Sequence, residues 1–191
     1  MRQQRRGQKS SNTLRIIGGD WRGRKLEFPP SPNLRPTGDR IRETLFNWLA
    51  PDIRGSRCLD LFAGSGALGL EALSRGASHC TFLETSAIAI NVINTHLTRL
   101  NAGGRGRVVN TNALFWQDDP FDIVFVDPPF SEGLAIDSLS HLINNRLLTD
   151  GALVYLEVPS TTSLEDLPAC LSVVRDKRTG SVRYLLLEKP P

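Results

Sequence analysis

The chain has 191 residues, of which 40% are hydrophobic and 23% are charged, and this composition is typical of a globular protein with a sizeable core. These proportions exclude disordered, collagen-like and coiled-coil proteins. The sequence contains no run of about 18 apolar residues, and no apolar segment follows Arg5 and Arg6. We therefore expect a cytoplasmic protein with neither a membrane span nor a secretory signal.

Positive charge is concentrated at the N-terminal end. The net charge is +3, but residues 1–42 carry 11 Lys and Arg against 3 Asp and Glu, a net of +8, and the remainder carries a net of −5. A basic segment favours binding to a phosphate backbone, because each neutralised phosphate releases counterions. The alternative is a solubilising tail. We favour contact with nucleic acid, because the bias continues through Arg35, Arg40 and Arg42.

The first 52 residues predict an arm followed by a small basic extension. Residues 1–12 are polar, basic and aperiodic, and we expect them to be disordered. Short strands are predicted at Leu14–Ile17 and Lys25–Phe28, and together they can form a hairpin. Thr37 can cap a following helix, which Pro51 would end.

From residue 57 onward, strand and helix patterns alternate, which indicates an α/β protein with a mostly parallel sheet covered on both faces. The last two strands have only a short connection and should form an antiparallel hairpin at one edge. We predict one domain at 13–191, with an N-terminal extension at 13–52 and a seven-stranded Rossmann-like core at 53–191. The predicted strands are 57–62, 80–84, 108–111, 122–126, 152–158, 171–175 and 182–188, and the predicted helices are 67–75, 86–100 and 133–146, with a short connection at 113–117.

The three cysteines, Cys58, Cys80 and Cys170, are far apart in sequence and lie in apolar runs. Their spacing matches neither a zinc site nor a redox pair. The sequence predicts buried, unreactive thiols and no bound metal.

A glycine-rich turn follows the first core strand. Gly64 and Gly66 allow a ligand to approach the backbone closely, and the stretch from Gly64 to Gly69 matches the dinucleotide pattern, with Glu84 placed to accept ribose hydroxyls. A nicotinamide enzyme is therefore one interpretation, and a tight structural turn is another. Asp60 favours a third interpretation, a binding site for S-adenosylmethionine. A carboxylate at this position suits a cationic ligand, and S-adenosylmethionine carries an ammonium and a sulfonium but no phosphate.

A second motif, Asp127-Pro128-Pro129-Phe130, follows the apolar strand at 121–126. Two prolines fix the backbone and remove amide donors, which leaves carbonyl groups free to accept hydrogen bonds. Asp127 and the Pro128 carbonyl can accept the two N–H bonds of an amino group on a nucleobase, while Phe130 stacks on the ring. A loop that is merely stiffened by proline is the alternative.

Together the two motifs predict methyl transfer to an exocyclic amine. Such an amine is a poor nucleophile, because its lone pair is delocalised into the ring. Two hydrogen-bond acceptors fixed in the right directions can pull the nitrogen toward a pyramidal geometry and make the lone pair available. Because the methyl group of a sulfonium is already electrophilic, catalysis consists mainly of alignment, with the nitrogen about 3 to 3.5 Å from the methyl carbon.

These motifs resemble those of class I S-adenosylmethionine-dependent methyltransferases. The match narrows to the RsmD family of bacterial small-subunit ribosomal RNA methyltransferases, which the chain resembles over residues 13–190. The matching blocks are Gly18-Gly19-x-x-x-Gly23-Arg24-x-Leu26, Arg35-Pro36-Thr37-x-x-x-Ile41-Arg42-Glu43-x-Leu45-Phe46-Asn47, and Leu59-Asp60-Leu61-Phe62-Ala63-Gly64-Ser65-Gly66-x-Leu68-Gly69-x-Glu71-Ala72.

The resemblance implies methylation of the N2 amine of one guanine, conventionally numbered 966, in 16S rRNA of the assembling small subunit. It implies S-adenosylmethionine as the methyl donor. We also expect a monomer, and no metal, because the sulfonium methyl group needs no metal to activate it. Many related enzymes have an aspartate in place of Asn112. The implied cofactor residues are Asp60, Ala63, Gly64, Ser65, Gly66, Glu84, Asn112 and Ala113; the catalytic residues are Asp127, Pro128 and Phe130; and the RNA contacts are Arg22, Arg24, Arg35, Thr37, Arg40 and Pro129. For Arg35, Thr37 and Arg40, closing the cofactor site is the alternative role.

Several other functions are compatible with parts of the sequence. An adenine-N6 DNA methyltransferase shares the Asp-Pro-Pro motif, but it needs a domain that reads DNA and flips the base, and only about 60 residues separate Gly66 from Asp127. A protein-glutamine methyltransferase would normally have Asn at position 127. A non-catalytic RNA-binding assembly factor is a further alternative, although Asp60, Glu84 and Asp127 are all present. A nicotinamide oxidoreductase would have no use for the motif Asp127-Pro128-Pro129-Phe130.

Overall fold

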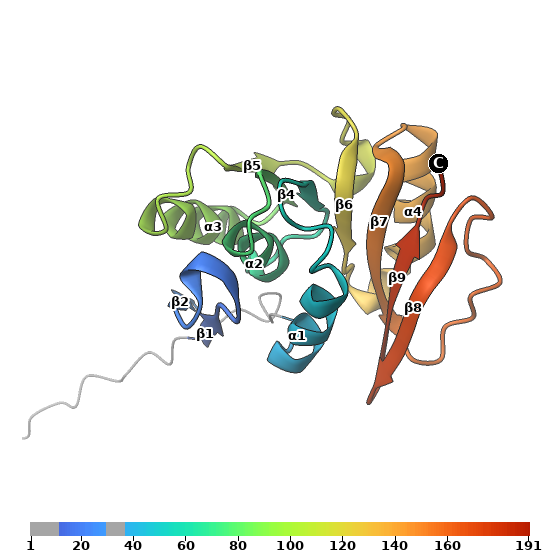
Figure 1. The fold of residues 1–191 in the computed structure, drawn as a ribbon, viewed down its shortest axis with the longest axis horizontal. Coiled ribbons are helices and arrows are strands. Elements are labelled where there is room, and N and C mark those ends of the chain that lie inside the picture. Colours follow the sequence, from blue (N-terminus) through green and yellow to red (C-terminus); the bar gives the residue numbers. More distant parts are fainter. Residues whose placement is uncertain (1–11, 30–36) are drawn as a thin grey trace, which may run out of the picture.

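The computed structural model describes residues 12–29 and 37–191. A sheet of seven strands forms its centre, and it is flanked by helices and by a separate two-stranded hairpin (Figure 1). The predicted arm therefore lies outside the described residues, apart from Asn12, which begins the first strand. None of the described helices combines the length and apolar character needed to cross a membrane.

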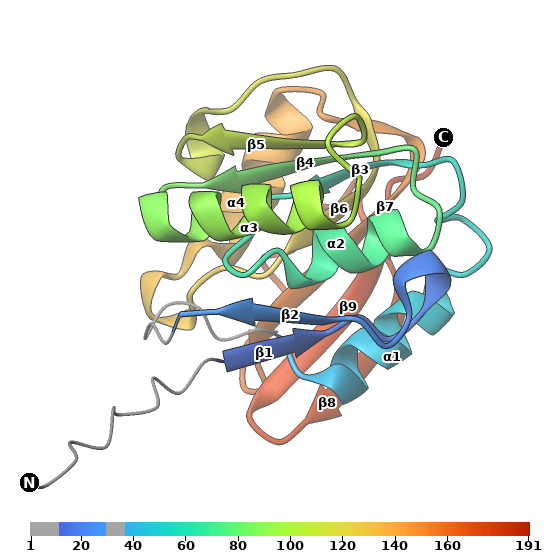
Figure 2. The ribbon, with the colours of Figure 1, turned by 90° about the vertical axis from the view of Figure 1, so that its left-hand side faces the viewer.

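The N-terminal extension contains the predicted hairpin and helix. Strand β1 (Asn12–Arg15) pairs antiparallel with β2 (Lys25–Phe28), and the turn η1 (Gly19–Trp21) lies between them. Leu14, Leu26 and Phe28 are buried because one face of this hairpin packs on the main core. Figure 2 shows the hairpin running beside α2 (Ala67–Ser74).

Helix α1 (Asp39–Trp48) begins later than the sequence suggested. Gly38 is its N-cap and no side chain caps it, so the prediction that Thr37 caps the helix is wrong. The Thr37 hydroxyl donates instead to a carboxylate in the core, at 2.9 Å. A hydroxyl-to-carboxylate bond is stronger than a bond between neutral groups, which accounts for this choice of partner. The helix ends before Pro51, as predicted.

The central sheet has the predicted strands in the order β5-β4-β3-β6-β7-β9-β8. Its first five strands are parallel, whereas β9 is antiparallel to both β7 and β8. The predicted edge hairpin is confirmed. Its inner strand is β9, which pairs with β7, and its outer strand is β8. The strands are β3 (Arg57–Asp60), β4 (His79–Glu84), β5 (Gly106–Asn110), β6 (Phe121–Val126), β7 (Leu148–Pro159), β8 (Ser172–Thr179) and β9 (Val182–Glu188).

Helices cover both faces of this sheet. On one face, α1, α2 and α3 (Ala87–Arg99) contribute to a core cluster with Phe82, Phe125 and Tyr155. On the other face, α4 (Leu134–Asn144) packs through Leu139 on a second cluster, which also contains the short turn η2 (Ala113–Phe115). Side chains of the parallel strands alternate between the clusters, as a sheet buried on both faces requires.

The thiol prediction is correct for two of the three cysteines. Cys58 and Cys80 are buried, whereas Cys170 is exposed. Cys170 directly precedes the buried Leu171, but its apolar neighbours Ala169 and Val173 are exposed, so the apolar run here does not indicate burial.

Candidate functional site

The glycine turn joins the end of β3 to the start of α2. Gly64 and Gly66 adopt φ values of +51° and +77°, in the left-handed region that favours glycine. A Cβ atom added to Gly64 would meet no atom closer than 3.9 Å, so the space beside this backbone is open. At Gly69 a Cβ would lie 2.2 Å from the Phe82 ring, so only glycine lets α2 pack this closely on β4. The turn therefore leaves the backbone of Gly64 open at the carboxyl end of the sheet, whereas a Cβ atom added to Gly66 would lie 3.1 Å from Ile93 and 3.2 Å from Leu70.

Glu84 holds this turn from the end of the neighbouring strand. Its Oε2 accepts the Gly64 N–H at 2.8 Å, and its Oε1 accepts the N–H groups of Thr85 and Ser86, each at 2.8 Å. A carboxylate offers about four acceptor positions, of which these bonds use three. Glu84 therefore holds the glycine turn in place, a role that the sequence did not predict, and one acceptor position stays open.

The second motif lies at the carboxyl end of β6, with its residues in different surroundings. Pro128 is buried, Pro129 is exposed, and Phe130 has 42% of its surface exposed. Asp127 Oδ2 accepts the hydrogen bond from Thr37, which precedes α1 and is 90 residues away in sequence. The N-terminal extension thus supplies a direct contact to the motif.

Four carboxylates stand at the ends of four adjacent strands. Each follows by two positions a residue of the first core cluster, so all four point to the face that α1 and α2 cover. Register pairs Asp60 with Phe82 and Phe125, and Val126 with Leu156, so Glu84, Asp127 and Glu157 each lie one pleat beyond Asp60. In sheet order this carboxylate row consists of Glu84, Asp60, Asp127 and Glu157.

Burial raises the pKa of three members of this carboxylate row, Asp60, Asp127 and Glu157. Burial raises the pKa of Asp60 to about 7, and the charges of Asp127 and Glu84 add to the rise, while the Gly69 N–H donated to Oδ2 at 3.0 Å opposes it. The pKa of Asp127 rises to about 6 through burial, against the Thr37 hydrogen bond. The pKa of Glu157 rises to about 7 through burial and the nearby Asp127. Ion pairs among the described residues do not include any member of the row. A cationic ligand would therefore be stabilised here.

A buried ion-pair network attaches the N-terminal extension to the core. Glu71, on α2, accepts the backbone N–H groups of Ile17 and Gly18, each at 2.8 Å. It also pairs with Arg42 of α1 at 3.4 Å and with Arg75 at 2.8 Å, and both Glu71 and Arg42 have side chains with no exposed surface. The network fixes the start of α1, and with it Thr37, relative to the sheet.

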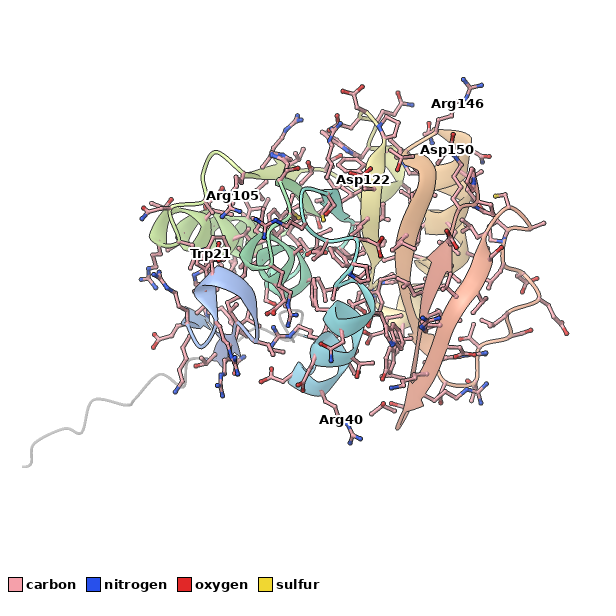
Figure 3. The ribbon with its side chains drawn as sticks, in the orientation of Figure 1. Trp21, Arg40, Arg105, Asp122, Arg146 and Asp150 are labelled. Atoms are coloured by element: carbon pink, nitrogen blue, oxygen red, sulfur yellow. The ribbon has the colours of Figure 1, made fainter. Side chains whose placement is uncertain are left out.

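The remaining predicted residues do not all lie at this edge, because Arg22 follows Trp21, whose N–H donates to Ser74 at the opposite end of α2 from the glycine turn. Asn112 follows β5, and its Oδ1 accepts the Leu114 N–H at 2.9 Å, while Ala113 is buried. Ala63 and Ser65 are buried within the glycine turn. Arg40 projects from α1 into solvent, as Figure 3 shows, and Arg22 and Arg24 are exposed on the hairpin side. Arg35 lies outside the described residues.

Sequence reasoning missed two parts of the site. Glu157 and Tyr155 lie in β7 next to Asp127, and the network of Arg42 and Glu71 positions Thr37. The signal for the first was present, because Glu157 is a carboxylate at the end of an apolar strand, as Asp127 is. Among the described residues, no three His, Cys, Asp or Glu side chains are grouped as metal ligands.

Comparison with known proteins gives the same picture. The family model described as "Conserved hypothetical protein 95" matches residues 14–188. Ribosomal RNA small subunit methyltransferase D of Escherichia coli K12 is 50% identical over 182 residues, covering 94% of this chain and 91% of that protein. The Haemophilus influenzae protein of the same name is 45% identical over 181 residues, covering 92% of this chain and 93% of that protein.

Solved structures agree with the sequence relatives. A putative methyltransferase, yhhF from Escherichia coli, superposes with a TM-score of 0.87 at 48% identity, covering 94% of this chain and 99% of that one. A putative methyltransferase, SMU.776, complexed with S-adenosylhomocysteine, has a TM-score of 0.74 at 11% identity, covering 96% of this chain and 57% of that one.

The sheet order, the glycine turn and these structural matches define a class I S-adenosylmethionine-dependent methyltransferase fold. Within that class, the chain belongs to the RsmD family. The resemblance stated from its motifs is thereby confirmed.

Proposed function

We propose that this protein methylates the exocyclic N2 amine of a guanine in 16S rRNA, at the position conventionally numbered 966, in the assembling small ribosomal subunit. The observation that carries the proposal is the position of Asp127-Pro128-Pro129-Phe130, one strand away from the glycine turn of a methyltransferase fold. The names of the relatives, which specify small-subunit rRNA, support the class of substrate.

S-Adenosylmethionine fits the end of the carboxylate row beside the glycine turn, because it would bring positive charge to Glu84 and Asp60, which have no ion-pair partner among the described residues. When bound, it supplies an electrophilic methyl group. Asp60 and the open backbone of Gly64 would hold its methionine end, with Ala63, Ser65 and Gly66 forming the rest of the turn around it. Glu84 has one acceptor position left for a ribose hydroxyl. Asn112 and Ala113 would border the adenine.

The amine-binding half of the site would use the second motif. Asp127 Oδ1 and the Pro128 carbonyl would accept the two N–H bonds of the guanine amine, and the partly exposed Phe130 would stack on the base. The Thr37 hydroxyl holds Asp127 through Oδ2. Its hydrogen bond opposes the rise in the pKa of Asp127 that burial causes, and so favours the carboxylate form that accepts an N–H. We therefore assign Thr37 to positioning Asp127 rather than to RNA.

RNA binding would involve the basic N-terminal extension. Exposed Arg22, Arg24 and Arg40 would contact phosphates, and Pro129 would line the entry for the flipped base. We assign Arg35 to the same surface on sequence alone. We propose a monomer acting in the cytoplasm, with residues 13–191 as one domain whose extension, 13–52, is attached to the core through Glu71.

The test is transfer of labelled methyl from S-adenosylmethionine to small subunits that lack the modification, compared with naked 16S rRNA and DNA. We expect N2-methylguanosine at one nucleotide, no transfer by Asp127→Ala with cofactor affinity unchanged within a few fold, and normal transfer by the exposed control Asp137→Asn. Transfer to adenine or to a protein glutamine would replace the proposed substrate. Full activity of Asp127→Ala would refute the proposed amine geometry.

A further inference from the structure

Glu157 lies directly beside Asp127, across the junction of β6 and β7. These parallel strands pair Val126 with Leu156, so the two acids follow paired residues on strands about 4.8 Å apart. They share a face of the sheet with Tyr155, which precedes Glu157 by two positions. Only 7% of the surface of Glu157 is exposed.

One oxygen of Glu157 is held by the protein. The Tyr155 hydroxyl donates to Oε2 at 2.7 Å, and Tyr155 has no exposed surface. Hydrogen bonds among the described residues include none to Oε1. A buried carboxylate ordinarily has partners for both oxygens, so this arrangement leaves an acceptor available next to Asp127.

A guanine edge presents two neighbouring donor groups, N1–H and the N2 amine, on adjacent ring positions. Two carboxylates side by side can accept both. Adenine presents a bare N1 acceptor at the corresponding place, which would face the carboxylate without a proton between them. The spacing of Asp127 and Glu157 therefore matches a guanine better than an adenine.

We propose that Glu157 determines base specificity, accepting the N1–H of the target guanine while Asp127 holds the N2 amine. This inference rests on the proposed function. Glu157 forms no covalent bond and takes no proton in the transfer. Tyr155 orients it by binding Oε2, so that Oε1 remains the acceptor for the base.

The test compares guanine with 2-aminopurine at the target nucleotide of reconstituted small subunits. Both bases carry the 2-amino group, but 2-aminopurine has a bare N1. We expect the wild-type protein to methylate guanine about 10- to 100-fold more efficiently, as kcat/KM, which is the discrimination given by one well-placed base contact. Equal efficiency on the two bases would overturn the proposal with no variant needed.

Glu157→Gln supplies the decisive comparison, because its amide can donate to a bare N1. We expect this variant to lose efficiency on guanine and to gain it on 2-aminopurine, so that the preference falls at least tenfold. A purely structural role would lower both efficiencies together, and an unchanged ratio would overturn the proposal. The matched control, Glu165→Gln at an exposed position, should keep the wild-type ratio.

The experiment separates this inference from the proposed function. If the wild-type protein transfers no methyl to guanine N2, both are overturned. If it does so and the ratio of Glu157→Gln matches the wild-type ratio, only the role of Glu157 is lost. Cofactor affinity, measured by calorimetry, should be the same in wild type and variant, because β7 lies two strands away from the glycine turn.

Discussion

Replacing Thr37 by valine tests how the N-terminal extension acts on the reaction. Valine keeps the shape of threonine and removes the hydroxyl that donates to Asp127 at 2.9 Å. The Thr37 carbonyl, which accepts from Arg42 Nε at 3.1 Å, is untouched, so the start of α1 should stay in place. The change therefore removes one hydrogen bond from the carboxylate and little else.

The size of the effect follows from that bond. A hydrogen bond to a charged group contributes about 1.5 to 3 kcal/mol, and one pKa unit corresponds to about 1.4 kcal/mol. Asp127 accepts the amine as a carboxylate, and its pKa is about 6 in the wild-type protein. Losing the donor raises that pKa, so the midpoint of the pH–rate profile should move upward by about 1 to 2 pH units.

The assay is methyl transfer to small subunits between pH 5 and pH 9. At pH 7 we expect Thr37→Val to be about two- to tenfold slower than wild type, with most of the rate recovered at pH 9. Thr37→Ser, which keeps the hydroxyl, should retain the wild-type profile. An unshifted midpoint in Thr37→Val, with the protein folded and binding cofactor normally, would refute the assigned role of Thr37.

Three further predictions concern the network and the cofactor site. Glu71→Ala removes the buried partner of Arg42 and should lower stability by about 3 to 5 kcal/mol, seen as a Tm lower by about 6 to 20 °C; an unchanged Tm would contradict the network's role. The pKa of Asp60 is raised to about 7, so its unfavourable buried charge appears as the pH rises through 7, and Asp60→Asn should be more stable than wild type at pH 8. The same variant should bind S-adenosylmethionine more weakly in calorimetry, and an unchanged affinity would exclude a cofactor contact. Glu84→Ala frees the Gly64 N–H and should weaken the cofactor at least tenfold, whereas a normal dissociation constant would refute the ribose assignment.

Local sequence patterns were sufficient to predict the elements of the core. Each predicted strand and helix from 57 onward is present, because apolar runs and helical spacing depend on neighbouring residues. Boundaries moved most where a pattern was ambiguous, as at β7, which begins at Leu148 rather than at 152. The prediction at Thr37 failed because its hydroxyl found a stronger partner, 90 residues away, than the local helix end.

The two motifs were recognisable without a structure because each occupies a few consecutive residues after a strand. The position of the two motifs relative to each other could not be predicted in this way, since strand order depends on long-range pairing. The position of β9 between β7 and β8, for example, has no signal in the spacing of the last two strands.

Local spacing and residue type were therefore enough to predict the class of fold, the glycine turn and the amine-binding motif. The row formed by Glu84, Asp60, Asp127 and Glu157 became apparent in the folded protein alone, since strand neighbours and side-chain faces are set by pairing across the sheet. The same holds for the contact between Thr37 and Asp127, because that contact depends on how α1 packs on the core. Burial then raises the pKa of Asp60, Asp127 and Glu157, an effect that arises only once water is excluded.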